Sequence, residues 1–299
     1  MAIPLDGADR AAAGYLEEWV PRFLPYHTDL VRELALAAGQ RVLVTCCGPG
    51  TEVFGVARAV GEGGRVRATD TRRAMVDLCA RRAAEAGMTQ VDCAVAEASD
   101  TSGGPWDAVV CAFGLWQFDG RSQVIAAWGE ALREHGKVGV MTFGPPEPDE
   151  PFERFAGIVR ELEPSVPYRA PRVNAERAAM QLLFADAGLA MVRLTVVRHT
   201  MSFGSAEAFV AALRHASTWR SVWEAVGDVR WDRLTSRFYD AVGGPSAALT
   251  FEPTATIAIA TRPGDEVELA HRPSVRAPHV PGSRPPPSRG EPGNKGGAE

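Results

Sequence analysis

The sequence of 299 residues has no excess of basic residues and no long apolar run. Its 32 Lys and Arg against 37 Asp and Glu give a net charge of −5, which predicts neither a nucleic-acid nor an anionic-membrane partner. No apolar stretch approaches the roughly 20 residues of a membrane span. The start, MAIPLDGADRAAAGY, lacks a basic region followed by an apolar core, so we expect no signal peptide and a cytoplasmic, soluble protein.

Cysteine is scarce and shows no paired C-x-x-C spacing. We expect free thiols in a reducing compartment. Two of the thiols are adjacent and no histidine lies at ligand spacing from them, so we predict no metal site. The five cysteines are Cys46, Cys47, Cys79, Cys93 and Cys111.

With 45% hydrophobic and 23% charged residues, the chain can form a large globular core. Its most informative stretch is RVLVTCCGPGTEVFGVA, residues 41–57, where an apolar run breaks into a glycine-rich turn that leads into a helical pattern. In a strand–loop–helix of this kind, backbone N–H groups and the positive helix end face a ligand. The stretch predicts a nucleotide-type cofactor site.

Strand and helix patterns alternate along the chain, which is typical of a parallel sheet built from βαβ units. We predict an α/β, Rossmann-like fold, with a mostly parallel seven-stranded sheet, helices on both faces and a helical lid inserted between the last two strands. Helical periodicity also covers residues 8–38, where Pro21 and Pro25 should divide two helices. Beyond the strand at 41, expected strands are 65–69, 91–95, 106–111, 137–142, 189–201 and 254–261, and expected helices are 51–60, 72–86, 122–132, 175–187 and 205–216.

These patterns divide the chain into five parts: N-terminal helices (1–40), a cofactor-binding core (41–201), a helical insert (202–250), a last core strand (251–262) and a tail (263–299). The tail is dense in Pro, Gly and charge and has few large apolar residues, so we expect disorder. Truncation near Pro263 should leave fold and activity intact.

Asp70 ends the second expected strand about 20 residues after the loop, where a carboxylate can accept hydrogen bonds from both ribose hydroxyls. This spacing suits NAD and S-adenosylmethionine (SAM) equally. The dinucleotide fingerprint requires a third glycine, and Val53 stands at its position. The missing glycine favours SAM.

Four segments in order, VLVTCCGPGTEV, GGRVRATDTRRAM, FGLWQF and GKVGVMTFGPPEPDEPF, resemble class I SAM-dependent methyltransferases of the ubiquinone/menaquinone-biosynthesis type, which are common in bacterial secondary metabolism. The resemblance covers about residues 10–262. It implies that the N-terminal helices cover SAM, with Asp70 on the ribose and Gly48 and Gly50 near the methionine portion. The other implied cofactor residues are Tyr15, Thr45, Cys46, Cys47, Thr71, Met75, Glu97, Ala98, Cys111 and Phe113.

Two positions depart from that family. Val44 stands where an aspartate is usual, and Cys46 stands at the first loop glycine. Because the aspartate helps to hold the cofactor's amino end, its absence should weaken SAM binding. We expect Val44→Asp to bind SAM more tightly.

Methyl transfer requires mainly alignment of nucleophile, methyl carbon and sulfur, and a base only for a nucleophile of high pKa. Tyr15, His27 and His199 are the candidate catalytic residues, each with a structural role as the alternative. A nucleophilic thiol at Cys46 or Cys47 is the less favoured interpretation, since the cofactor fills that loop. The candidate acceptor residues, for which core packing is the alternative, are Phe113, Trp116, His199, His215, Trp219 and Trp223.

The sequence therefore favours a SAM-dependent methyltransferase that yields S-adenosylhomocysteine and acts on a small apolar or aromatic acceptor of the natural-product type, at oxygen or carbon. Two alternatives remain open. One is a methyltransferase-like cyclase or isomerase that uses SAM without transfer, and the other is a non-catalytic partner subunit.

Overall fold

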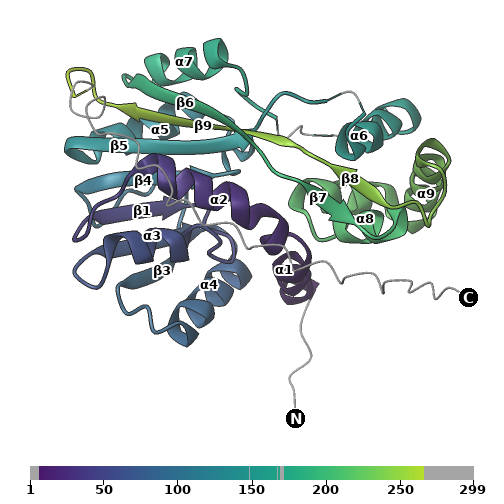
Figure 1. The fold of residues 1–299 in the computed structure, drawn as a ribbon, viewed down its shortest axis with the longest axis horizontal. Helices are drawn as coiled ribbons and strands as arrows, with labels where there is room; N and C mark the ends of the chain where they lie inside the picture. Colours follow the sequence, from purple (N-terminus) through teal and green to yellow (C-terminus); the bar gives the residue numbers. More distant parts are fainter. Residues whose placement is uncertain (1–6, 148, 167, 169–171, 266–299) are drawn as a thin grey trace, which may run out of the picture.

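The computed structural model describes residues 7–147, 149–166, 168 and 172–265 (Figure 1). Seven strands form one sheet in the order β3-β2-β1-β4-β5-β9-β6, with β9 antiparallel to both of its neighbours. This is the predicted Rossmann-like, mostly parallel sheet. The strands are β1 (Arg41–Thr45), β2 (Arg65–Asp70), β3 (Val91–Val95), β4 (Trp106–Ala112), β5 (Leu132–Phe143), β6 (Ala190–Arg198) and β9 (Thr254–Thr261).

Helices cover both faces of the sheet. On one face, Val42 and Val44 of β1 pack with buried residues of α2 (Val20–Leu34), α3 (Val53–Val60) and α4 (Arg73–Glu85). On the other face, Leu43 packs with α5 (Arg121–Glu130) and α7 (Arg177–Asp186). The alternation of Val42, Leu43 and Val44 between two cores is the period of two expected of a strand buried on both sides.

The N-terminal helical pattern breaks at Trp19, between α1 (Gly7–Glu18) and α2. Pro21 stands in the first turn of α2, where its missing N–H costs no helical bond. The expectation that Pro25 also marks the break is wrong, because Pro25 lies inside α2. Its missing N–H leaves one helical bond unmade in the second turn, and the buried face of α2 compensates.

One helix was not expected: α6 (Pro151–Leu162) follows a proline-rich stretch. Its buried residues Phe155, Ile158 and Val159 follow helical spacing, and Pro151 occupies the first turn. The signal was therefore present, but the prolines before it mark a turn more strongly. The expected tail lies almost entirely outside the described residues.

The insert between β6 and β9 is mostly helical, as predicted. It contains α8 (Ala206–Leu213) and α9 (Ser217–Val242), and two short antiparallel strands that were not predicted, β7 (Met201–Phe203) and β8 (Leu249–Phe251). In Figure 1 the insert, α6 and α1 gather beyond one end of the sheet. Because β6 runs in the same direction as β5 and leads into β7, this is the end at which the parallel strands finish.

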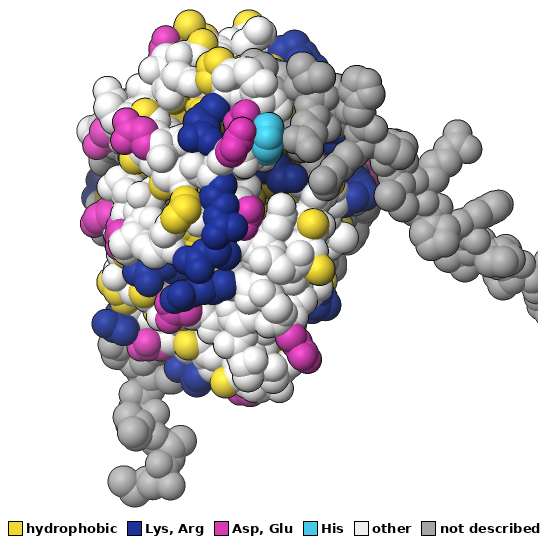
Figure 2. All heavy atoms as spheres, turned by 90° about the vertical axis from the view of Figure 1, so that its left-hand side faces the viewer, with side chains coloured by type: hydrophobic (Ala, Val, Ile, Leu, Met, Phe, Trp, Pro, Cys, Tyr) yellow, Lys and Arg dark blue, Asp and Glu magenta, His cyan; other side chains and the backbone are white. Residues whose placement is uncertain are grey.

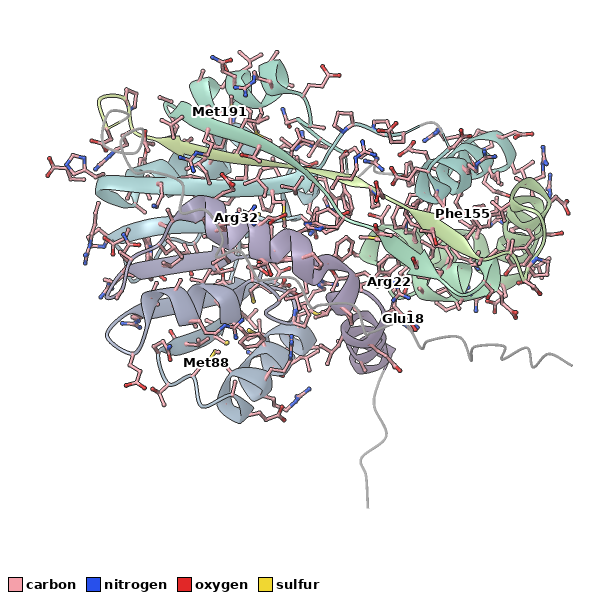
Figure 3. All side chains as sticks on the ribbon, viewed as in Figure 1. Glu18, Arg22, Arg32, Met88, Phe155 and Met191 are labelled. Carbon is pink, nitrogen blue, oxygen red and sulfur yellow. The ribbon has the colours of Figure 1, made fainter. Side chains whose placement is uncertain are left out.

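The N-terminal helices are attached to the insert. Trp19 donates its indole N–H to the carbonyl of Ala212 at 2.8 Å. Arg22, beside Glu18 in Figure 3, places its guanidinium 4.0 Å from the centre of the Phe203 ring. These contacts join the two segments that enclose the end of the sheet.

The opposite end of the molecule carries a band of basic side chains (Figure 2). Arginines at the starts of strands belong to this end, and they are paired with aspartates: Arg67 with Asp92 at 3.3 Å and Arg133 with Asp107 at 3.5 Å. None of the described helices is both long enough and apolar enough to span a membrane. All five cysteines are free, as expected.

Candidate functional site

The loop after β1 is held open by two glycines. Gly48 and Gly50 have φ values of +50° and +87°, a conformation that glycine adopts without strain. A Cβ on Gly50 would lie 2.7 Å from the sulfur of Cys79, whereas a Cβ on Gly48 would meet no atom within 4 Å. The loop is therefore packed against Cys79 at Gly50, whereas the space next to Gly48 contains no protein atoms.

Cys46 has a backbone conformation that favours glycine, the residue that the resembled family usually has at this position. Its φ is +53°, in the left-handed region that costs a residue with a Cβ about 1–3 kcal/mol. Its side chain is accommodated by Gly114, where a Cβ would lie 2.8 Å from the Cys46 sulfur. A hydrogen bond with Cys111, together with burial, raises the pKa of the Cys46 thiol far above its usual range. The thiol therefore stays protonated at neutral pH, which argues against the nucleophile interpretation.

Asp70 lies over the same loop. Its side chain is 7% exposed, and its two oxygens accept hydrogen bonds from the backbone N–H groups of Gly48 and Arg72, each at 3.0 Å. These bonds fix the carboxylate at the strand end. A carboxylate has about four acceptor sites, so two remain for ligand hydroxyls.

Phe113, just after β4, also has a positive φ, +54°, which is unusual for a bulky residue. Its N–H donates to the carbonyl of Met141 at 2.7 Å, and its ring packs 4.6 Å from Phe143 and 5.1 Å from Phe23, measured between centroids. Packing thus holds a strained residue in place. Together with Cys46, it puts a left-handed residue after each of the two central strands, as is common at ligand sites.

Tyr15 of α1 connects the loop with the acceptor side. Its ring packs with Met75 of α4, and its phenol lines the cavity described below. Burial raises the pKa of the Tyr15 phenol above its usual range; Arg72 lowers this pKa, and Glu52 and Asp70 raise it. The phenol therefore stays protonated at neutral pH.

The remaining predicted cofactor residues lie on neighbouring strand ends. Thr71 is exposed just after β2, and Glu97 is exposed after β3. Ala98 is buried, and its carbonyl accepts the indole N–H of Trp128 at 2.7 Å. Thr45 and Cys47 are buried at the end of β1 and in the loop, and Cys111 is buried in β4.

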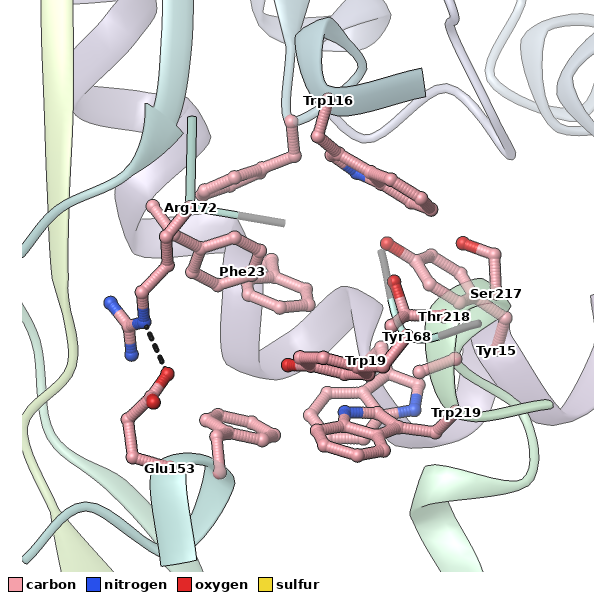
Figure 4. A pocket seen from close by; sticks show the side chains of 14 residues that line it. Tyr15, Trp19, Phe23, Trp116, Glu153, Tyr168, Arg172, Ser217, Thr218 and Trp219 are labelled. Carbon is pink, nitrogen blue, oxygen red and sulfur yellow. Dashed lines mark hydrogen bonds and ion pairs between the residues drawn. The ribbon is translucent and has the colours of Figure 1, made fainter. Parts of the chain in front are cut away.

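An aromatic cavity of about 80 Å³ adjoins Tyr15 and Phe113 (Figure 4). Helices α1, α2, α6 and α9 all contribute to its wall. Of the predicted acceptor residues, Phe113, Trp116 and Trp219 line it. The sequence did not single out the others, which are Trp19, Phe23, Phe143, Phe152, Glu153, Tyr168, Arg172, Ala216, Ser217 and Thr218.

One side of this cavity is polar. Arg172 donates to Glu153 at 3.0 Å, to the carbonyl of Gly144 at 2.6 Å and also to Glu150. Burial raises the pKa of Glu150, and the neighbouring Arg172 lowers it. Figure 4 places Arg172 and Glu153 together, away from Tyr15 and Ser217. A second guanidinium, that of Arg160, lies 3.9 Å from Oε2 of Glu153. Because both guanidinium groups are already paired with acids, this side is not an open anion site.

The structure places three of the predicted histidines outside the aromatic cavity. His199 lies 2.6 Å from Asp29 through its Nε2 and packs against the ring of Tyr26. His27 is buried, with its Nδ1 3.2 Å from Glu52. His215 packs over Gly14 of α1, where a Cβ would lie 2.2 Å from its ring.

Trp223, expected at the acceptor wall, lines a separate hollow between α8 and α9, together with His215. Its indole donates to Asp228 at 2.8 Å. Trp219, one helical turn earlier, packs 5.2 Å from both Phe155 and Tyr168. The insert therefore presents Trp219 to the aromatic cavity, and Trp223 and His215 elsewhere.

Residues 42–136 match a family model described as a methyltransferase domain. A search of curated proteins found no match to the chain. Among solved structures, a protein from Bacillus halodurans C-125, described provisionally as a methyltransferase, has 17% identity and a TM-score of 0.55, over 79% of this chain and 98% of that one.

Two further structures are similar at comparable levels. A SAM-dependent methyltransferase from Aquifex aeolicus has 16% identity and a TM-score of 0.50, over 64% of this chain and 93% of that one. The cyclase SpnF has 17% identity and a TM-score of 0.51, over 79% of this chain and 80% of that one. At this identity the likeness concerns the fold. Residues 42–136 therefore match the model of a methyltransferase domain, and the chain shares its Rossmann-like fold with these structures.

Proposed function

We propose that the protein is a SAM-dependent methyltransferase that acts on a small apolar or aromatic acceptor at an oxygen or carbon atom. The main support is one arrangement: Asp70 fixed over a glycine loop that has free space at Gly48, directly beside an aromatic cavity. In this proposal, the loop and Asp70 hold the adenosyl group, and the aromatic cavity accommodates the acceptor next to it.

The residues present fit SAM. Asp70 keeps two acceptor sites for the ribose hydroxyls, and Thr71 and Met75 follow on the side assigned to the adenine. The free space over Gly48 leaves room for the methionine portion, with Phe113 beside it. When bound, SAM supplies an electrophilic methyl group.

The protein's part in the reaction is alignment and exclusion of water. Tyr15, protonated because burial raises the pKa of its phenol, closes the boundary between cofactor and acceptor. The aromatic wall excludes water and presents flat apolar surface. The cavity of about 80 Å³ is smaller than the roughly 300–1,000 Å³ of ligand pockets, so we expect its wall to move outward when an acceptor binds.

The polar side of the cavity selects the acceptor further. Arg172 already donates to Glu150, Glu153 and Gly144, while Glu153 is 23% exposed and keeps free acceptor sites. An acceptor with a hydroxyl or N–H group at the end remote from the cofactor fits this side. A carboxylate or phosphate there would be repelled by Glu153.

Cofactor binding and transfer are measured separately. Purified protein is titrated with S-adenosylhomocysteine by calorimetry, and then incubated with labelled SAM and a panel of phenols and apolar alcohols. Binding together with label transfer supports the proposal. Product formed without release of S-adenosylhomocysteine supports the cyclase or isomerase alternative, and absence of binding supports the partner-subunit alternative.

The polar side is tested with Glu153→Gln. For an accepted phenol or alcohol with a donor at its far end, KM should rise about tenfold, because a hydrogen bond to a charged group is lost. Glu161→Gln, an exposed acid on the same helix, is the matched control. An unchanged KM in E153Q would refute this part of the proposal.

A further inference from the structure

A second carboxylate is buried near the cofactor loop. Glu52 directly precedes α3, and its side chain is 2% exposed. Its Oε2 lies 3.2 Å from Nδ1 of His27, which is within ion-pair distance. Neither its Oε1 nor that Nδ1 has a hydrogen-bond partner among the described residues. Burial of a carboxylate oxygen without a partner is costly, so such a group is expected to receive a ligand.

No arginine or lysine among the described residues forms an ion pair with Glu52. His27 is itself buried in α2, and its ring centre lies 5.6 Å from that of Phe113. The His27 ring therefore lies between Glu52 on one side and Phe113, the residue of positive φ after β4, on the other. This is the side of the loop assigned to the methionine portion of SAM.

The charge of Glu52 reaches the loop itself. Burial raises the pKa of Tyr15, and Glu52 adds to that rise despite the opposing effect of Arg72. For Cys46, the hydrogen bond with Cys111 and burial raise the thiol pKa, and Asp70 and Glu52 raise it further. The Glu52 carboxylate therefore contributes to the electrostatic environment of both Tyr15 and Cys46.

This acid stands on the same side of the sheet as a missing one. Val44, which stands where the family that the sequence resembles usually has an aspartate, is fully buried and packs in the core that includes Val53 of α3. The amino end of SAM carries a positive charge that requires a carboxylate or carbonyl partner. Near the loop, Asp70 is assigned to the ribose hydroxyls, which leaves Glu52 as the buried acid that has an oxygen without a partner among the described residues.

We propose that Glu52 binds the α-ammonium group of SAM in place of the acid absent at Val44, and that His27 is a positioning residue which holds the other oxygen of Glu52. The assignment rests on the proposed function. It adds a new prediction, that recognition of the cofactor's amino group comes from the start of α3 rather than from the end of β1.

Two ligands and two variants test it. S-Adenosylhomocysteine carries the ammonium group, whereas 5′-methylthioadenosine lacks the amino-acid portion. Calorimetry should show that Glu52→Gln weakens S-adenosylhomocysteine binding about 10- to 100-fold, the usual effect of losing a charged hydrogen bond. Binding of 5′-methylthioadenosine should change less than about twofold. Glu62→Gln, an exposed acid just beyond the same helix, should change neither.

The outcomes separate the two proposals. If wild-type protein binds neither ligand, the proposed function fails and this assignment fails with it. If wild type binds both but E52Q weakens both equally, or neither, the assignment alone is overturned. The double variant Val44→Asp/Glu52→Gln should regain most of the preference for S-adenosylhomocysteine, and an unrestored preference counts against the exchange of acids.

A measurement without a variant guards against misfolding of E52Q. A crystal structure of wild-type protein with S-adenosylhomocysteine should place the ligand's ammonium nitrogen about 2.7–3.2 Å from Glu52 Oε1. An ammonium group bound by other atoms, with Oε1 unoccupied by it, overturns the proposal.

Discussion

Gly114→Ala tests whether the cysteine in the cofactor loop depends on a glycine across the site. A Cβ at position 114 would lie 2.7 Å from the Cys46 Cβ, 2.8 Å from its sulfur and 2.9 Å from the Cys111 sulfur. Ordinary carbon contacts are about 3.5–4.0 Å, so the overlap is severe. Gly114 itself has φ −95°, which alanine adopts freely. The substitution therefore isolates the clash from any change in backbone preference.

Overpacking of this kind costs about 1–3 kcal/mol of unfolding free energy. In a domain of this size each kcal/mol lowers the melting temperature by about 2–4 °C. The displaced loop should also weaken S-adenosylhomocysteine binding in G114A. Thermal unfolding followed by circular dichroism, urea unfolding and calorimetric titration measure the three quantities.

The compensating change is Cys46→Gly, which removes both Cys46 atoms from the clash and relieves the φ of +53° at that residue. In the double variant, alanine at 114 should cost much less than it does in the wild type, with a coupling energy of about 0.5–3 kcal/mol. Additive effects of the two substitutions, or a G114A protein as stable as wild type, would refute the reasoning.

Three further predictions follow from the same site. Asp70→Asn should weaken S-adenosylhomocysteine binding about 10- to 100-fold, while Asp77→Asn on the exposed face of α4 should not; equal affinities by calorimetry would contradict this. Gly50→Ala should lower the unfolding free energy by about 1–3 kcal/mol, because of its φ of +87° and the Cys79 sulfur, whereas urea unfolding should show Gly63→Ala to be near neutral. The hydrogen bond with Cys111 and burial raise the pKa of Cys46 in the folded state only, so stability is full below the ordinary thiol pKa of about 8.5 and falls as pH rises beyond it; a melting temperature that stays constant from neutral to alkaline pH would argue otherwise.

The positions of the predicted cofactor residues at one edge of the sheet could be predicted, because the information for them is local. Asp70 ends a strand, the loop and Phe113 each follow one directly, and parallel strands bring their carboxyl ends to one edge of the sheet. Sequence also pointed to the odd positions Val44 and Cys46. It did not show that Cys46 takes a positive φ, or that Gly114, distant along the chain, makes room for its side chain.

The acceptor half was not predictable to the same degree, because it is assembled by packing between distant segments. Arg172 and Glu153 belong to a loop and a helix for which the sequence predicted no role. Trp219 and Trp223 stand at positions i and i+4, a spacing that predicts one shared helix face. Only Trp219, however, lines the aromatic cavity. Which way α9 faces depends on its contacts with α6, such as Phe155 against Trp219, and not on its own pattern.

The short ladder between β7 and β8 determines how a change in the length of the insert affects the sheet. It pairs Met201 with Phe251 and Phe203 with Leu249, so the insert leaves and rejoins the core at neighbouring points of the backbone. The entropic cost of closing a loop grows only slowly with its length. Inserts of different length can therefore be joined at the β7–β8 ladder with little effect on the stability of the sheet. The wall that the insert contributes to the aromatic cavity can thus change independently of the sheet. The insert can therefore differ in length without a change at the edge of the sheet that carries the glycine loop and Asp70.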